Sequence, residues 1–314
     1  MVTAIAPPGG HGRDLYGYGP TPPRVTWPGK ARVAVSFVLN IEEGSEQRTT
    51  RGDPVNETVY DMIEERNHSP NLTMESHFDY GARAGYWRIV RVLERFGATC
   101  TVNACAEALE LTPWIARDCV DRGYEIACHG ERWLSHAGMT REEERASIAR
   151  SVARIEAVAG VRPIGWHTRC PHTEHTRELL VQEGGFAYDS DAYDDDLPSI
   201  VEVDGKHHVV LPYSLDTNDM RFQRPESPFV RASDFADYVN DAFDWLWREG
   251  EDVPKMMTIG LHTRTIGRPA RIAGLEAVLE HMTKRGGAWI ATRADIADHW
   301  RAAVPTLVLP LARP

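Results

Sequence analysis

The stretch Tyr124-Glu-Ile-Ala-Cys-His-Gly-Glu-Arg-Trp-Leu-Ser-His136 indicates where the fold places its chemistry. Its first five residues are mostly apolar and strand-forming, and the pattern then breaks at His129-Gly130. This order predicts a buried strand that delivers a histidine to a turn. An isolated histidine is usually a structural residue, so the rest of the chain has to decide between a structural and a functional role.

Size and charge narrow the class of protein. The chain has 314 residues, 42% of them hydrophobic, and apolar segments recur along its length. We therefore predict one domain at residues 30–303, between an N-terminal arm (1–29) and a C-terminal tail (304–314). The net charge of −11 provides no basic surface for nucleic acid or an anionic membrane, so we predict neither partner.

Other segments bear on localisation and on structural cross-links. No apolar run is long enough to cross a bilayer, and the start of the chain lacks the pattern of a secretory signal, so we expect a cytoplasmic protein. The five cysteines are odd in number and form no C-x-x-C pair. This predicts neither a disulfide framework nor a structural zinc site.

Strand-like and helix-like segments alternate along the chain. Seven strands are predicted at 32–39, 99–104, 124–128, 163–167, 186–190, 255–262 and 288–292, with a β-hairpin at 200–213. Six helices are predicted at 86–96, 113–122, 140–159, 175–183, 234–248 and 270–285, with Thr140 and Ser233 as N-caps. Residues 45–81 are polar and are predicted to form a long functional loop. The alternation favours a mostly parallel sheet and, at this length, a closed or nearly closed (β/α) barrel.

Side chains with catalytic chemistry gather where the predicted strands end. They are Glu42, Glu43, His129, His167, Arg169, Asp189, Asp191 and His262. In (β/α) barrels the chemistry lies at the C-terminal ends of the strands, so this pattern favours an enzyme over a binding protein. Carboxylates and histidines around one opening can activate water and protonate a leaving group. The sequence has no G-x-S-x-G nucleophile motif, which favours attack by water over a covalent intermediate.

Five motifs, in the correct order, resemble those of the polysaccharide deacetylase (carbohydrate esterase) superfamily, whose fold is a distorted seven-stranded (β/α) barrel. Asn40-Ile-Glu-Glu-Gly44 stands at the family's T-F-D-D-G, and His129-Gly-Glu-Arg-Trp133 stands at its H-x-x-x-H metal motif. Arg169-Cys-Pro-His172 stands at R-x-P-Y. The segment Asp216 to Asp219 and Ile259-Gly-Leu-His262 stand at the motifs that orient the base and supply the catalytic acid.

Two departures change what this resemblance implies. Glu43 replaces the metal-binding Asp, and Trp133 replaces the second metal-binding His, so the family's metal triad is incomplete. These departures resemble the cofactor-independent allantoinase branch of the superfamily. The same branch is similar at Arg13 to Gly19, Trp27 to Gly29, Glu75 to Gly81, Tyr188 to Asp196, Leu215 to Phe222 and Gly260 to Arg271.

The motifs and the resemblance together predict the site residues. We predict catalytic roles for Glu42, Glu43, His129, Arg169 and His262, and substrate contacts for Asn40, Trp133, His167 and Arg264. Adjacent residues of a strand face opposite sides, so we expect one of the two glutamates to face the pocket. Trp133 either stacks on a flat ring or plugs the barrel mouth. We expect no metal; a bound zinc ion would require Glu43, His129 and either His136 or His167.

The resemblance implies a hydrolase of C–N bonds in cyclic amides, with allantoin opened to allantoate as the leading reaction. In this reaction Glu42, Glu43 or His129 activates water, Arg169 stabilises the oxyanion and His262 protonates the ring nitrogen. The alternatives are another cyclic imide or hydantoin hydrolase, or a metal-dependent N-deacetylase of polysaccharide or peptidoglycan. A silent barrel that binds a ring compound is the alternative of a different class. The family likeness and the proline-rich arm also predict a homo-oligomer.

Overall fold

The computed structural model describes residues 13–58, 67–224 and 228–309. Its sheet is built around β1 (Val33–Ile41), which is buried along its whole length. One edge of β1 pairs in parallel with β8 (Lys255–His262). The other edge pairs with β9 (Ala288–Ile290) near its start and with β2 (Thr101–Ala104) near its end. A strand covered on both faces explains the continuous β-branched and apolar run in the sequence.

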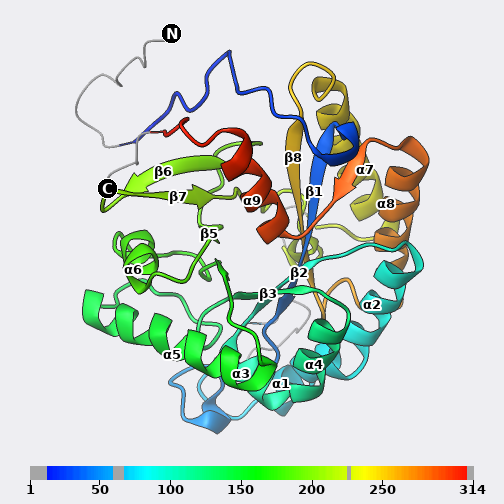
Figure 1. Ribbon diagram of the computed structural model, residues 1–314. Coiled ribbons are helices and arrows are strands. Elements are labelled where there is room, and N and C mark those ends of the chain that lie inside the picture. The colour runs from blue at the N-terminus through cyan, green and yellow to red at the C-terminus, as the bar shows by residue number, and fades with distance from the viewer. Residues whose placement is uncertain (1–12, 59–66, 225–227, 310–314) are drawn as a thin grey trace.

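The sheet continues from β2 in the order β3, β4, β5, β7 and β6 (Figure 1). These strands are β3 (Glu125–Cys128), β4 (Gly165–Trp166), β5 (Tyr188–Asp189), β6 (Ser199–Val203) and β7 (Lys206–Val210). Only the β6–β7 hairpin is antiparallel. The predicted seven strands and hairpin are therefore confirmed, and the fold is the α/β barrel of the deacetylase type. The sheet curls into a half-barrel. It does not close, since β6 and β8 are the two ends of the hydrogen-bonded path within the described ranges.

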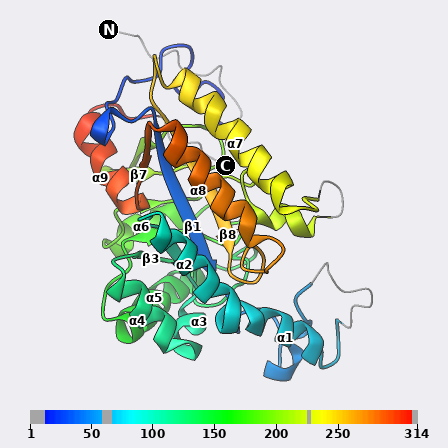
Figure 2. The same ribbon diagram turned by 90° about the vertical axis from the view of Figure 1, so that its right-hand side faces the viewer.

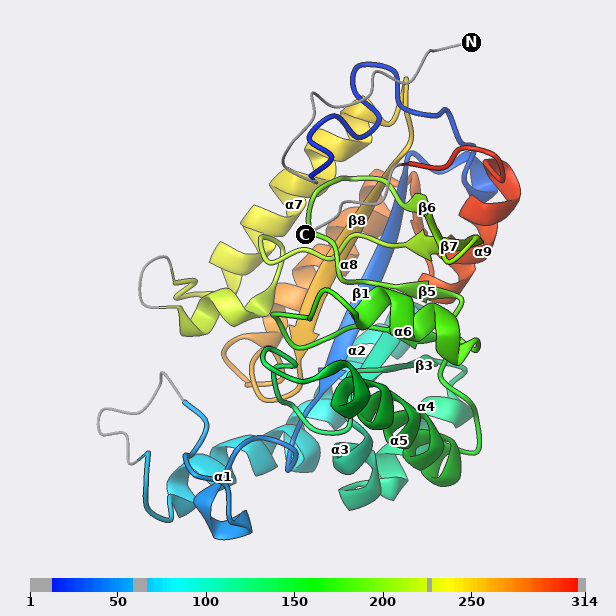
Figure 3. The same cartoon turned by 90° about the vertical axis from the view of Figure 1, so that its left-hand side faces the viewer.

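Nine α-helices lie in the described part of the chain, and most of them cover the outside of this sheet (Figure 1). They are α1 (Leu72–Tyr80), α2 (Tyr86–Arg95), α3 (Ala106–Leu111), α4 (Pro113–Asp121), α5 (Arg141–Ala159), α6 (Thr176–Glu183), α7 (Ala232–Glu249), α8 (Ile272–Arg285) and α9 (Arg293–Ala303). Helices α7 and α8 lie side by side on one flank (Figure 2). Helices α3, α5 and α6 cover the other flank (Figure 3). None of the helices in the described ranges is long and apolar enough to cross a membrane.

The predicted loop 45–81 is partly wrong, because α1 occupies its last quarter and a single π-helical turn (Gly81–Gly85) connects α1 to α2. Asn71 caps α1 by accepting a hydrogen bond from the backbone N–H of Met74. Met74 and Phe78 are the buried contacts of this helix. Two apolar anchors among polar neighbours give too weak a period to be recognised in the sequence.

Helix boundaries account for the remaining differences. The capping box at Thr140 is confirmed, since Thr140 and Glu143 bond each other's backbone. Ser233 does not cap α7; the Asp234 carboxylate instead accepts from two backbone N–H groups that precede the helix. Helices α3 and α9 were not predicted, α3 because it is only six residues long. The start of α9 is defined by Thr292, whose side chain accepts from the backbone of Asp295.

Candidate active site

Three strands deliver the central side chains to one rim of the half-barrel. Glu42 directly follows β1, His129 directly follows β3, and His262 is the last residue of β8. Because the three strands are parallel members of one sheet, their C-terminal ends lie together. Gly130 has φ +89°, which a residue with a side chain rarely adopts, and this glycine turns the chain immediately after His129.

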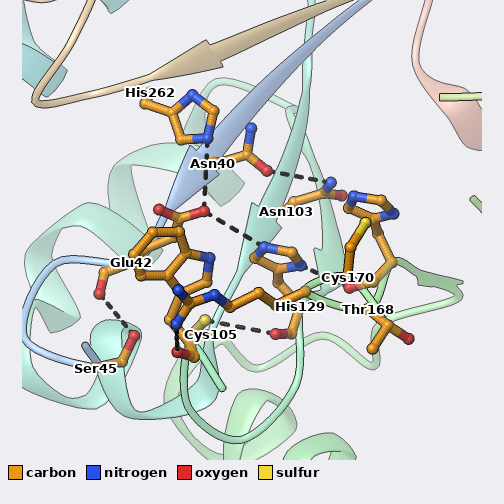
Figure 4. Close-up of polar contacts among 12 residues, drawn as sticks. Asn40, Glu42, Ser45, Asn103, Cys105, His129, Thr168, Cys170 and His262 are labelled. Atoms are coloured by element: carbon orange, nitrogen blue, oxygen red, sulfur yellow. Dashed lines mark hydrogen bonds and ion pairs between the residues drawn. The ribbon is translucent and has the colours of Figure 1, made fainter. Parts of the chain in front are cut away.

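The Glu42 carboxylate lies between two imidazoles (Figure 4). Its Oε1 is 3.4 Å from Nε2 of His129 and 3.6 Å from Nε2 of His262, and Oε2 accepts a hydrogen bond of 2.7 Å from Arg264. Oε1 is buried and has no hydrogen-bond partner in the described part of the chain. Burial alone would raise the pKa of Glu42, but Arg264 and the two histidines lower it far below its usual range. Glu42 is therefore ionised.

His262 is fixed by Asp219, the first residue of a short 3-10 helix (Asp219–Gln223). Its Nδ1–H donates to Oδ1 of Asp219 at 2.6 Å, and the backbone N–H groups of His262 and Ile266 donate to Oδ2. Burial opposes a charge on His262, but Asp219 and Glu42 outweigh it and raise the pKa of His262 above its ordinary value. The imidazole is held as a proton donor whose Nε2–H faces Glu42.

His129 has the opposite arrangement. Its Nδ1 lies 2.6 Å from the backbone carbonyl oxygen of His167. A carbonyl oxygen can only accept, so Nδ1 carries the hydrogen. In the neutral ring, Nε2 is then a lone pair that points toward the Glu42 carboxylate. The carbonyl of His167 therefore fixes the orientation of His129, and the Nε2 atoms of both histidines lie near one carboxylate.

His167 stands next to His129 in the same wall. The two rings are parallel, with centroids 5.2 Å apart, and His167 also stacks on Tyr213 at 4.3 Å. Nδ1 of His167 lies 3.2 Å from Oδ1 of Asp191. Burial lowers the pKa of His167, with Asp191 opposing it, so the ring is neutral. Tyr213 in turn accepts a hydrogen bond from the Asn40 amide at 3.1 Å.

Two arginines and Trp133 form the opposite side of the site. The Arg169 guanidinium lies 3.8 Å from the Trp133 ring centre, forms a bidentate pair with Glu57 (2.7 and 3.0 Å) and donates to the Trp133 carbonyl. Arg264 is 2% exposed and lies 4.9 Å from the same ring. Trp133 is therefore packed between charged groups at the pocket wall.

Glu43 does not line the pocket. Its carboxylate accepts hydrogen bonds from the Thr263 hydroxyl and from the backbone N–H of Glu42, and it packs on the helical Gly81, where any Cβ would overlap it. Burial, with a smaller contribution from Glu42, raises its pKa against the opposing effect of Arg264. Of the two adjacent glutamates, Glu42 faces the pocket and Glu43 lies behind it.

The side chains do not fit the metal site that the superfamily implies. Glu43 is turned away, and Trp133 has no ligand atom. His136, named above as an alternative ligand, instead bonds Glu144 at 2.9 Å outside the pocket. Within the described ranges, no group of three or more His, Cys, Asp or Glu side chains could hold a metal ion. The described side chains of Glu43, His129 and His136 are therefore not brought together as a ligand set.

One pocket of about 230 Å³ connects these groups. Eight of the nine predicted site residues line it, Glu43 being the exception: Asn40, Glu42, His129, Trp133, His167, Arg169, His262 and Arg264. The volume is below the range typical of sites for drug-sized ligands, so a small molecule fits it. The charges are balanced, since Glu42 pairs with Arg264, Asp219 with His262 and Glu57 with Arg169.

Two groups of the site were missed in the sequence as individual residues. Asp219 lies in a segment that was assigned only approximately, and Tyr213 ends the hairpin without a motif. Asp219 follows Asn218, whose side chain caps the short helix. An Asn-Asp pair that opens a helix is a signal for an oriented carboxylate, but not for its partner histidine, 43 residues later.

The fold and the acid–base groups define a hydrolase. The family model for polysaccharide deacetylase matches residues 67–188. A Schizosaccharomyces pombe protein whose name assigns it to the polysaccharide deacetylases is 36% identical over 318 residues, covering 93% of this chain and 98% of that protein. The chain therefore belongs to the polysaccharide deacetylase family.

Two solved structures are similar over nearly the whole chain. The crystal structure of Puue allantoinase has a TM-score of 0.90 and 43% identity, and covers 95% of this chain and 99% of its own. A Pseudomonas aeruginosa PAO1 protein, described as a probable polysaccharide deacetylase, has a TM-score of 0.89 and 42% identity, and covers 93% and 99%. One of these structures is an allantoinase and the other is described as a probable polysaccharide deacetylase, which are two of the activities that the sequence motifs raised.

Proposed function

We propose that this protein hydrolyses a C–N bond of a small cyclic amide, with allantoin, opened to allantoate, as the leading substrate. The observation that carries the proposal is the unpaired Glu42 Oε1 between Nε2 of His129 and Nε2 of His262. The balanced charges of the pocket suit a neutral ring, and its volume suits a small one. The 43% identity to Puue allantoinase supports the choice of substrate.

In the proposed reaction His129 is the general base. Its Nε2 lone pair removes a proton from water as the water oxygen attacks the ring carbonyl carbon. Glu42 is a poor base because its pKa is held so low. Its charge instead stabilises the imidazolium that forms 3.4 Å away.

His262 is the general acid. The attack produces a tetrahedral oxyanion, and the C–N bond breaks as the ring nitrogen takes the proton from Nε2 of His262. Asp219 keeps this imidazole protonated and oriented. The products are a ring-opened carboxylic acid and the released nitrogen, which in allantoate is part of a ureido group. His129 then gives its proton to solvent, and His262 takes a proton from solvent to restore the acid form.

Arg169 is proposed to orient the carbonyl oxygen and to stabilise the oxyanion. Three of its five N–H groups bond Glu57 and the Trp133 carbonyl, which leaves two for a substrate oxygen. Trp133 is proposed to hold Arg169 in place by stacking on its guanidinium. We also propose that no metal takes part, since the side chains that would hold one are replaced or turned away.

The second candidate function is N-deacetylation of an amino sugar. It is favoured by the S. pombe relative, which carries a polysaccharide deacetylase name. Both reactions add water to an amide carbonyl, so His129 and His262 would have the same roles. The difference lies in the substrate, which is a ring carbonyl in one case and a pendant acetyl group in the other.

A substrate panel tests the proposal. Purified protein is assayed with allantoin, hydantoin, dihydrouracil, succinimide and N-acetylglucosamine oligomers, with His262→Asn as the inactive control. We expect turnover of allantoin or another cyclic amide that His262→Asn lowers at least about 100-fold. Release of acetate with no ring opening would favour the deacetylase, and absence of turnover on every compound would favour a silent binding barrel.

A further inference from the structure

His167 occupies a position in the pocket that the proposed reaction does not use. It is 4% exposed and lines the pocket beside the catalytic groups. Its ring is held between aromatic contacts to His129 and Tyr213 and cannot swing without breaking both. A buried, ring-stacked histidine that still reaches the pocket requires an explanation other than packing.

The hydrogen on His167 is placed by Asp191. The Asp191 carboxylate is fixed by the backbone N–H and the hydroxyl of Thr168, at 2.8 and 2.6 Å. Nδ1 of His167 lies 3.2 Å from this carboxylate. The contact is not aligned as a hydrogen bond, but an Nδ1 lone pair facing the carboxylate would be repelled, so the hydrogen is on Nδ1. Nε2 of the neutral ring is then a lone pair, and no described residue bonds it.

Several other polar groups of the pocket are donors or are already paired. Arg169, Arg264 and His262 are donors, which suit the carbonyl oxygens of a substrate. The Asn40 oxygen accepts from Asn103, and Glu42 is committed to Arg264 and the two histidines. A cyclic ureide has ring N–H groups as well as carbonyls, and a buried N–H without an acceptor costs binding energy.

We infer that His167 determines specificity by accepting, at Nε2, a hydrogen bond from a ring N–H group of a cyclic ureide substrate. This inference rests on the proposed cyclic amide hydrolase. It narrows the substrate class from cyclic amides in general to rings with an unsubstituted N–H beside the reacting carbonyl. A site built to bond an N–H discriminates strongly against a ring that lacks it.

The test combines variants with substrates. Three proteins are compared: wild type, His167→Phe and His167→Gln. The phenylalanine keeps a ring for stacking, and the glutamine restores an acceptor. Each is assayed with the preferred ring and its two singly N-methylated analogues. The matched control is His172→Phe, at an exposed histidine of the same loop that does not line this pocket. Melting curves establish that each variant is folded.

We expect His167→Phe to lower kcat/KM on the parent ring by about 10- to 100-fold, mostly through KM, and to affect one methylated analogue by less than about threefold. His167→Gln should recover much of the loss. Equal losses on the parent and both analogues, or no loss at all, would overturn the inference while leaving the hydrolase intact. If the wild type opens no ring, calorimetry with hydantoin tests the inference instead. Equal binding by wild type and His167→Phe, or no binding by either, would overturn the inference.

Discussion

Oε1 of Glu42 lies 3.4 Å from Nε2 of His129, while Oε2 of the same carboxylate bonds Arg264. Glu42→Gln would remove the charge that stabilises the His129 imidazolium. We expect kcat to fall by about 10²–10³-fold. Because buried Arg264 also loses its anionic partner, we expect a loss of stability of up to about 3 kcal/mol. Steady-state kinetics and denaturant unfolding measure the two effects.

Glu43→Gln is the matched control for this prediction. Glu43 is the next residue, but burial raises its pKa and it does not line the pocket. We expect its amide to leave kcat within about threefold of wild type, because the change removes no charge facing the substrate. Equal losses for both glutamine variants would contradict the assignment of Glu42 as the pocket carboxylate.

The pair of His262 with Asp219 predicts a pH dependence. Burial opposes the charge on His262, yet Asp219 and Glu42 raise its pKa above the ordinary 6.5, so the acid form persists to higher pH than in a free histidine and is lost as pH rises further. Activity should therefore decline on the basic side. Asp219→Asn removes the main attraction, and we expect the basic limb of kcat/KM against pH to move to lower pH. An unmoved limb would mean that another group is the acid.

The buried Glu46 predicts a pH dependence of stability. Burial raises its pKa to about 7 from 4.5. The folded state then binds this proton more tightly than the unfolded state, so the free energy of unfolding falls as pH rises from about 4.5 to 7. Glu46→Gln should match wild type at pH 4.5 and be more stable at pH 8, by on the order of 3 kcal/mol. The exposed Glu156→Gln should show no such difference, and a pH-independent Glu46→Gln effect would contradict the prediction.

The donor set of the site predicts independence from metal. We expect dialysis against a chelator to leave kcat within about twofold, and added zinc not to increase it, because Trp133 cannot ligate and Glu43 faces Thr263. Metal analysis of the purified protein provides the parallel measurement. A chelator-sensitive activity restored by zinc would favour the metal-dependent deacetylase.

The strands of the sheet could be predicted from the sequence because each strand is determined by residues that are close together along the chain. A continuous apolar run such as 33–41, or the break after Cys128, is decided by neighbouring residues and by burial on both faces. The same logic placed Glu42, His129 and His262 at strand ends. Helices α1 and α3 escaped prediction because one is anchored by two apolar residues and the other is very short.

The orientation of adjacent side chains could not be predicted in this way. Glu42 and Glu43 are chemically equivalent in the sequence, and their separation depends on Thr263 and Arg264, over 200 residues away. The role of Asp219 likewise depends on a contact with His262. Long-range pairings of this kind have no local signature, which is why the residues at the rim were recognised but their division of roles was not.

Glu57 holds Arg169 by a bidentate pair, and this contact predicts an effect on substrate binding. A carboxylate fixes the plane of a guanidinium through two parallel bonds, which an amide cannot reproduce. We expect Glu57→Gln to raise KM by about 5- to 20-fold with a smaller change in kcat, since Arg169 would still stack on Trp133 but with less defined orientation. Glu178→Gln is the matched control, because it breaks a similar bidentate pair, with Arg141, away from the pocket. Equal kinetics for Glu57→Gln and wild type would mean that Arg169 is oriented by Trp133 alone. A fall in kcat with unchanged KM would mean that Arg169 stabilises the oxyanion without orienting the bound substrate.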